Sequence, residues 1–111
     1  ELTIWDYEEI APILLRSHSV DWPDYPLTLP NWDNTPRSGM RGIVFNNSTP
    51  KLFQKHLHEA VSRVTSRPKD ERIVFLKAWN EWAEGNYVEP DLKFGHGYLE
   101  AIRNEIIKPS G

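Results

Sequence analysis

The stretch Ile73-Val74-Phe75-Leu76-Lys77-Ala78, followed by Trp79-Asn80-Glu81-Trp82-Ala83-Glu84-Gly85, decides the fold class of this chain. Its first part is a nearly continuous apolar run with β-branched members, which is the pattern of a strand buried on both faces in a parallel sheet. Its second part places carboxylates and tryptophans directly where that strand ends. Functional groups in parallel α/β folds lie at the carboxyl ends of strands. The stretch therefore predicts a parallel α/β fold with a site at this strand end.

Helical signals flank the predicted strand on both sides. Thr49 is placed as an N-cap and Pro50 at the first helical position, and apolar residues then recur on one face through about residue 66. A closing helix is expected from about residue 98 to residue 106, where apolar residues again recur at helical spacing. Both helices are long enough to cover one face of a sheet.

The N-terminal part of the chain gives weaker signals. Asp6 and Glu9 resemble a capping box and open a predicted helix over residues 7–16, although Pro12 weakens its pattern. Four prolines exclude a helix between residues 20 and 36, where residues 27–29 are expected to be a short strand that feeds a loop. A second brief extended segment is expected at residues 42–45.

The order of these elements predicts the architecture. Strands that alternate with helices form parallel sheets through right-handed crossovers. Only two main parallel strands are visible, whereas a barrel of eight such units takes roughly 200 residues or more. The 111 residues are therefore expected to form a single α/β unit, the C-terminal part of a (β/α)8 TIM-barrel-like domain, with a frayed tail at residues 108–111. Because the chain does not begin with methionine, we expect it to be part of a longer protein.

Composition excludes several classes of function. A net charge of −3 leaves no basic stripe for a phosphate backbone, so no nucleic-acid partner is expected. The chain has no cysteine, so disulfides, zinc-thiolate sites and thiol catalysis are excluded. The longest apolar run is far short of the roughly 20 residues that span a bilayer. Phosphate-loop and nucleophile-elbow motifs are missing, so no cofactor is expected.

Glu81 and Glu84 are the predicted catalytic pair. Glycosidases use two carboxyl groups, which lie about 5 Å apart in retaining enzymes and about 6.5–9.5 Å apart in inverting ones. In a helical turn, residues three positions apart lie on one face, so this pair can meet the shorter distance. Close like charges also raise one pKa, as a general acid requires. In the alternative interpretation Glu84 caps or ion-pairs a loop and Glu81 alone is functional.

The neighbouring polar and aromatic residues are predicted to bind substrate. Trp79 and Trp82 point to different faces if extended, so one is expected to stack on a sugar and the other to pack in the core. Asn80 either donates to a sugar hydroxyl or pins the backbone, and Glu89, with Asp91, either binds sugar hydroxyls or closes its loop.

The residues that follow the strand expected at 27–29 are predicted to form a second side of the substrate site. Trp32, Asp33 and Asn34 follow that strand, and the two polar residues are either a clamp for substrate or ordinary turn chemistry. No metal site is expected, because His56 and His58 lie two apart on a helix and face different ways. His96, between two glycines, is expected to be an exposed loop residue.

The chain resembles the WbsX-type glycosyltransferase family, also called glycoside hydrolase family 99-like, in three segments: Trp32-Asp33-Asn34-Thr35-Pro36-Arg37, Trp79-Asn80-Glu81-Trp82-Ala83-Glu84-Gly85-Asn86-Tyr87-Val88-Glu89-Pro90-Asp91 and Gly97-Tyr98-Leu99-Glu100-Ala101. The resemblance implies the C-terminal portion of such a domain. It also implies a role in lipopolysaccharide O-antigen or other surface-polysaccharide biosynthesis. The related family 99 hydrolases are endo-acting α-mannosidases on a (β/α)8 barrel.

The resemblance also implies roles for the two glutamates. Carried over from those hydrolases, Glu81 assists the 2-hydroxyl of the sugar as internal nucleophile and Glu84 is the general acid/base, without metal. Ala83 departs from the hydrolases, which have a larger polar residue there. We therefore expect a bacterial carbohydrate-active enzyme, a glycosyltransferase of surface-polysaccharide assembly. The alternatives are a retaining endo-glycosidase and a non-catalytic glycan-binding module. A cytoplasmic location, at or near the inner membrane face, and self-association through open sheet edges are also expected.

Overall fold

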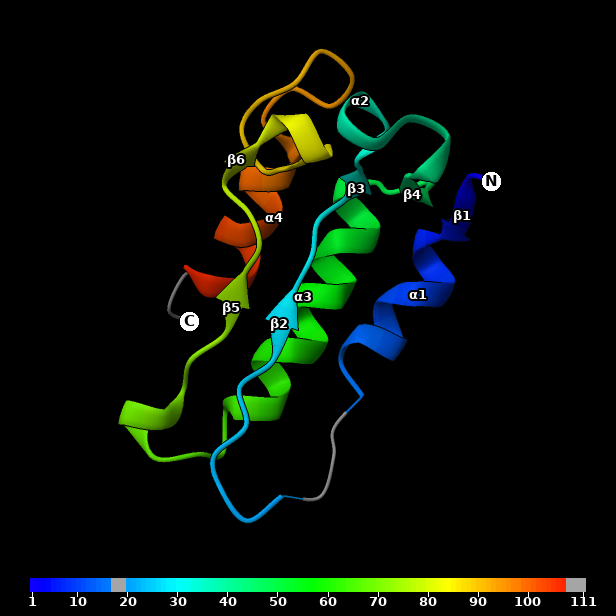
Figure 1. Ribbon diagram of the computed structural model, residues 1–111. Helices are drawn as coiled ribbons and strands as arrows, with labels where there is room; N and C mark the ends of the chain where they lie inside the picture. Colours follow the sequence, from blue (N-terminus) through cyan, green and yellow to red (C-terminus); the bar gives the residue numbers. More distant parts are fainter. Residues whose placement is uncertain (17–19, 108–111) are drawn as a thin grey trace.

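The computed structural model describes residues 1–16 and 20–107, which form a mixed α/β structure (Figure 1). The predicted tail at residues 108–111 lies outside the described residues. The α-helices are α1 (Tyr7–Leu14), α2 (Thr35–Ser38), α3 (Pro50–Val64) and α4 (Gly97–Ile106). The strands are β1 (Thr3–Asp6), β2 (Leu27–Thr28), β3 (Trp32–Asp33), β4 (Ile43–Asn46), β5 (Phe75–Leu76), β6 (Asn80–Glu81) and β7 (Asn86–Tyr87). Short 3-10 turns are η1 (Gly39–Arg41), η2 (Lys69–Glu71) and η3 (Trp82–Glu84).

The strands form three small sheets rather than one. β1 and β3 flank β4, with β1 parallel and β3 antiparallel to it. β2 pairs in parallel with β5, and β6 pairs antiparallel with β7. The predicted parallel pairing is therefore confirmed for the segments around residues 27 and 75. The expectation of two main strands is too simple. β1 and β3 form because they pair with β4, and β6 and β7 form because a tight turn brings them together. The periodicity of the sequence reveals neither kind of pairing.

The strand predicted over residues 73–78 differs from expectation in length and burial. Only Phe75 and Leu76 pair as β5, and Ile73 and Phe75 are 42% and 54% exposed. The prediction of burial on both faces is therefore wrong for this chain. The physical reason is that only one face of this segment packs against the helical core, through Val74 and Leu76, while Ile73 and Phe75 lie on the other face, which no described element covers. The backbone of β5 is fixed by bonds from Phe75 N–H to Pro26 O (2.9 Å) and from Lys77 N–H to Thr28 O (3.0 Å).

The N-terminal helix begins where predicted but is capped differently. α1 spans Tyr7–Leu14 and contains Pro12. Asp6 makes no capping bond, so the predicted capping box is wrong; its carboxylate instead accepts a hydrogen bond from the side-chain amide of Asn47 (3.1 Å). The bond joins the end of β1 to the end of β4, and the parallel pairing of these strands competes with the local cap.

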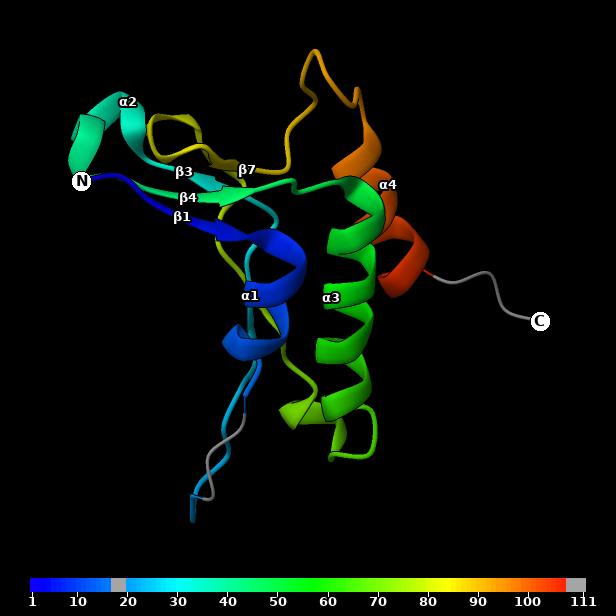
Figure 2. The same cartoon turned by 90° about the vertical axis from the view of Figure 1, so that its right-hand side faces the viewer.

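The core forms where α3 and α4 lie side by side (Figure 2). Thr49 caps α3 as predicted, because its hydroxyl accepts a hydrogen bond from Leu52 N–H at 3.2 Å. The buried residues of this core come from both helices and from the segment after β7: Phe53, Leu57, Val88, Tyr98 and Ala101. Within the part of the chain that the structure describes, no helix combines the length and apolar character needed to cross a membrane.

Candidate functional site

The two predicted motifs lie directly against each other. Gly85 has a φ of +54°, and a Cβ added there would lie 2.6 Å from the carbonyl oxygen of Asp33 and 2.8 Å from its nitrogen. Glycine therefore serves two purposes at this position: it adopts the left-handed turn and it lets the backbone approach β3. The sequence prediction that the two strand ends form one site is consistent with this contact.

The motif after β5 folds as a tight hairpin, which we call the acidic hairpin (residues 80–87). In its register Asn80 is opposite Tyr87, and Glu81 is opposite Asn86. The η3 turn connects the two strands and is closed by a bond from Gly85 N–H to Trp82 O (2.9 Å). Glu81 directly precedes this turn and Glu84 is its last residue, so the two glutamates span a 3-10 turn rather than sharing an α-helical one.

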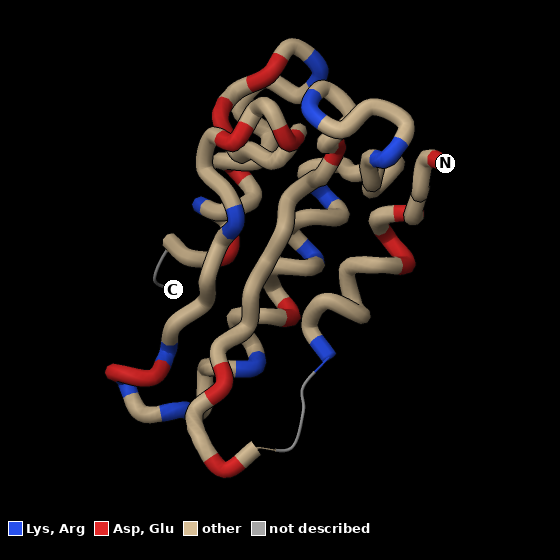
Figure 3. The backbone as a smooth tube through the Cα atoms, in the orientation of Figure 1, with Lys and Arg blue, Asp and Glu red and all other residues tan. Residues whose placement is uncertain are grey.

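Each glutamate lies near a different cation. Glu81 Oε1 lies 3.7 Å from Arg37 Nη2 of α2, and Glu84 Oε1 lies 3.9 Å from Lys77 Nζ. The Glu81 side chain is 41% exposed and that of Glu84 is 22% exposed. Figure 3 shows acidic and basic positions meeting at the end of the molecule that carries the hairpin and α2. Lys77 Nζ also lies 5.4 Å from the centre of the Trp32 ring, so one ammonium group links Trp32 to Glu84.

Neither tryptophan of the motif packs in the core. Trp82 stacks on Tyr87 with ring centres 3.8 Å apart and 14° between the planes, and it stays 46% exposed. Its indole N–H donates to Glu89 at 2.8 Å, so Glu89 orients Trp82 instead of bonding to the loop backbone. Trp79 is 54% exposed. The expectation that one of the two is buried is wrong, because the hairpin carries both outward from the strand end.

The remaining polar candidates of the motif have different surroundings. The Asn80 side chain is exposed while its backbone pairs with Tyr87. Asp91 closes its loop as predicted: its carboxylate accepts from Phe94 N–H (2.6 Å) and from the Tyr87 hydroxyl (2.8 Å). Burial and this bond to Asp91 raise the pKa of Tyr87 above its ordinary value, so the phenol stays protonated and donates to the carboxylate.

Asp33 and Asn34 both perform turn chemistry. One carboxylate oxygen of Asp33 accepts from the backbone N–H of Thr35 at 3.0 Å and from its hydroxyl. The side-chain oxygen of Asn34 accepts from Ile43 N–H at 2.7 Å, which holds the start of β4. The turn interpretation is therefore realised for both, and Asp33 in addition lines the cleft described next.

An open cleft of about 420 Å³ lies beside the acidic hairpin at the ends of β3 and β4. Trp32, Asp33 and Trp82 line it, whereas Glu81 and Glu84 are not among its lining residues. Asp91, which the sequence analysis considered beside Glu89, also lines it. Its remaining aromatic and polar walls come mainly from residues that the sequence did not single out: Phe45, Asn46, Asn47, Tyr87, Lys93, Phe94 and Tyr98.

Tyr98 is the clearest functional candidate that the sequence analysis missed. It was predicted only as an apolar position of the closing helix. Its hydroxyl lies 2.7 Å from Ser48 Oγ, and the single O–H of Ser48 donates to Pro30 O. Burial raises the pKa of Tyr98. The phenol therefore remains protonated at the edge of the cleft. The sequence signals for it were a polar atom at a helical core position and its place in the third segment of the family resemblance.

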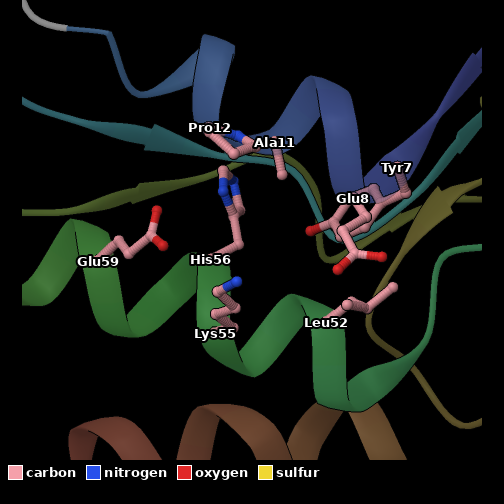
Figure 4. Close-up of a pocket in the computed structure, with 8 residues that line it drawn as sticks. All are labelled: Tyr7, Glu8, Ala11, Pro12, Leu52, Lys55, His56 and Glu59. Atoms are coloured by element: carbon pink, nitrogen blue, oxygen red, sulfur yellow. The ribbon is translucent and has the colours of Figure 1, made fainter.

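A second, smaller pocket of about 20 Å³ lies between α1 and α3 (Figure 4). His56 points into it from α3, and its Nε2 accepts a hydrogen bond from Leu29 N–H at 3.2 Å. Burial lowers the pKa of His56 to about 4. His58 is exposed and lies 2.9 Å from Glu105, so the two histidines face different ways as predicted.

Comparison with known proteins identifies the family. The chain matches the family described as "Glycosyltransferase WbsX" over residues 1–102. The chain belongs to the WbsX glycosyltransferase family. Two relatives, both described as "Uncharacterized protein WxcX", come from Xanthomonas campestris pv. campestris strain B100 and a second strain of the same pathovar, and each is 34% identical over 106 residues.

This match confirms the resemblance and supports a carbohydrate-related role for the WbsX family chain. The aligned region covers 95% of this chain but only 15% of each WxcX relative. No solved structure shows a significant match. The shared residues therefore represent a small part of the relatives' length.

Proposed function

We propose that this chain carries the acid/base pair and part of the sugar-binding cleft of a glycosyltransferase that acts in surface-polysaccharide biosynthesis, such as that of lipopolysaccharide O-antigen. The observation that carries the proposal is the contact of Gly85 with Asp33, which brings the glutamate motif to the strand end that bears Trp32. Membership of the WbsX family supports a carbohydrate substrate.

The proposed chemistry assigns one role to each glutamate. Glu84, whose side chain is 22% exposed, is the general acid/base. Glu81, next to the hairpin turn, takes the proton of the sugar 2-hydroxyl as that oxygen attacks the anomeric carbon; the bond to the leaving group breaks, and Glu84 protonates the departing oxygen. In the second displacement Glu84 takes the proton of the acceptor hydroxyl, which attacks the anomeric carbon and opens the ring formed by the 2-oxygen, and Glu81 returns its proton to that oxygen, with net retention of configuration. This route uses two carboxylates and needs no metal.

The cleft supplies the sugar contacts in this proposal. Aromatic rings bind the apolar faces of pyranose rings, and Trp32 and Trp82 both line the cleft. Asp33, with the exposed Asn80, supplies hydrogen-bond partners for hydroxyl groups. Asn34 and Glu89 contribute indirectly in the present arrangement, because each holds a neighbouring segment in place.

We further propose that the chain is part of a (β/α)8 barrel in a longer cytoplasmic protein. The parallel pairing of β1 with β4 and of β2 with β5, with helices in the segments that connect them, supports this proposal, because parallel strands with helical connections build such barrels. The small share of the WxcX relatives that the chain covers is consistent with this proposal.

A non-catalytic glycan-binding module is the second candidate, and one observation favours it. Neither Glu81 nor Glu84 lines the cleft, and each lies near a cation. A module that binds a glycan in the cleft would need the aromatic walls but not the acid/base pair. The two candidates therefore make opposite predictions for glutamate variants.

The test compares Glu84→Gln and Glu81→Gln with Glu100→Gln, which removes an exposed carboxylate from α4. Turnover is measured in the full-length protein on a panel of glycans, with transfer to an acceptor and release to water recorded separately. We expect Glu84→Gln to lower turnover by about a hundredfold to ten thousandfold while glycan binding persists. Near-normal turnover of Glu84→Gln would contradict the assignment of Glu84 as the general acid/base. No turnover by the unmodified protein, with saturable glycan binding, would favour the binding module. Release to water without transfer would favour a retaining endo-glycosidase.

A further inference from the structure

We propose that Asn31 and Asn86 are positioning residues of the glutamate site, because their side-chain amides fix the orientation of the acidic hairpin. We call these two side chains the asparagine clasp. The inference rests on the proposed function in assigning chemistry to Glu81 and Glu84. Its structural part, the control of hairpin order, is measurable without any turnover.

Asn31 replaces a strand neighbour with its side chain. Its Nδ2 donates to Tyr87 O at 3.0 Å, and its Oδ1 accepts from Tyr87 N–H at 2.8 Å. The amide therefore makes the same pair of bonds that a residue of an adjacent strand would make. Asn31 is 8% exposed, so these bonds are shielded from water. Because Tyr87 pairs with Asn80, the orientation of the first hairpin strand depends on this contact.

Asn86 joins three segments of the chain. It is fully buried, and its Nδ2 donates to Asn31 O at 2.8 Å and to Lys77 O at 2.9 Å. It lies directly opposite Glu81 in the hairpin register. The backbone of Glu81 is therefore paired with the residue that joins Lys77, directly after β5, to Asn31, directly before β3.

The clasp reaches Glu84 through Lys77. Asn86 fixes the carbonyl of Lys77, and Lys77 N–H is fixed by Thr28 O at 3.0 Å. With its backbone held on both sides, Lys77 presents its ammonium group 3.9 Å from Glu84. Both glutamates are thus connected to the clasp, Glu81 through the strand register and Glu84 through Lys77.

The clasp carries an energetic cost that packing alone does not explain. Asn86 Oδ1 is buried and has no hydrogen-bond partner in the described structure. A buried polar atom without a partner is unfavourable, whereas an apolar residue of similar size would fill the space without that cost. The benefit lies in the two N–H groups, which hold the segments that bear the glutamates.

The test uses Asn31→Ala, with Thr28→Val as matched control. Thr28 is also fully buried, and its hydroxyl donates to Phe75 O at 2.9 Å, so it joins β2 to β5 without touching the hairpin. Hydrogen exchange of Tyr87 N–H is measured by NMR on this chain relative to core amides of α3. Turnover and KM are measured in the full-length protein. Asn31→Asp, which keeps the acceptor and loses the donor, replaces Asn31→Ala if the latter does not fold.

We expect Asn31→Ala to raise the exchange of Tyr87 N–H about tenfold or more relative to the α3 amides, since two bonds are lost. We expect Asn31→Ala to lower kcat at least about tenfold and to change KM less than about threefold. Thr28→Val should change neither the relative exchange of Tyr87 N–H nor kcat. Equal effects of the two variants on exchange and on kcat would overturn the clasp. Because exchange does not depend on catalysis, a failure of the clasp is distinguishable from unchanged turnover in Glu84→Gln, which rejects the catalytic assignment.

Discussion

Gly85 and Gly95 allow two effects of a side chain to be separated at the residue scale. Both glycines have a positive φ, +54° and +57°. Only Gly85 lies against backbone, that of Asp33, whereas a Cβ at Gly95 would meet nothing within 4 Å. A side chain at either position would be strained by the left-handed conformation. At Gly85 alone of the two, the side chain would also clash with backbone.

Gly85→Ala is expected to lower the free energy of unfolding by about 2–4 kcal/mol, against about 1 kcal/mol for Gly95→Ala. The difference arises because the clash at Gly85 involves backbone, which cannot rotate away as a flexible side chain would. Urea denaturation of the two variants measures it. Equal losses would show that the close approach of the two motifs is not present in solution.

His56 makes stability depend on pH in a defined direction. Its pKa is lowered to about 4 by burial, so below about pH 6.5 the unfolded chain binds a proton that the folded chain does not. The titratable side chains that line the pocket beside His56 are those of Tyr7, Glu8, Lys55 and Glu59. The free energy of unfolding should therefore fall as pH drops from about 6.5 to about 4, by about 3 kcal/mol in total from this group.

His56→Gln isolates this contribution because glutamine can still accept a hydrogen bond from Leu29 N–H. Its denaturation midpoint should depend less steeply on pH between about 4 and 6.5 than that of the unmodified chain. His58→Gln, which removes an exposed imidazole from the same helix, should keep the full slope. If His56→Gln retained the slope as well, carboxylates rather than His56 would control acid stability.

At the scale of elements, local signals predicted α1, α3 and α4 and the segments that form β2, β4 and β5, but missed the other strands. They also missed α2, which begins at Thr35 although prolines were expected to exclude a helix up to residue 36; Pro36 lies in its first turn, where a proline is tolerated. α3 was located from Thr49, Pro50 and apolar spacing, because a cap and a helical face are set by residues within a few positions of one another. β3 and β6 contain two residues each, which is too short for an alternating pattern to be seen. β1 exists because β4 pairs with it across some 40 positions. Such pairings depend on tertiary structure and cannot be read from a local sequence pattern.

The acidic hairpin shows the same division within the site. Glu81, Trp82 and Glu84 lie together in the hairpin, as expected of a motif that is contiguous in sequence. The stack of Trp82 on Tyr87 and its bond to Glu89 were not foreseen, because they require the chain to reverse at Gly85. The asparagine clasp was missed for a different reason. Asn31 carries no pattern of its own, and its partner lies 56 positions away.

At the scale of the whole molecule, the described chain exposes apolar side chains where its strands have open edges. β1 and β5 each have one strand neighbour. Trp5 of β1 is 48% exposed and Phe75 of β5 is 54% exposed. Apolar side chains beside an unpaired strand edge favour association with another strand. The same feature is consistent with the proposed place of this chain within a larger barrel.

The isolated chain of 111 residues is therefore expected to self-associate through these edges. Sedimentation velocity over a range of concentrations should show reversible formation of species larger than the monomer. Phe75→Lys or Trp5→Lys places a charge on one strand edge. Each variant should shift the distribution towards monomer, because a charge at a strand edge blocks pairing. Met40→Lys is the matched control, since Met40 is 68% exposed and belongs to η1, outside both edge strands. A monomer at all concentrations would contradict edge pairing. Equal shifts from Met40→Lys would mean that added charge, rather than the strand edge, controls association.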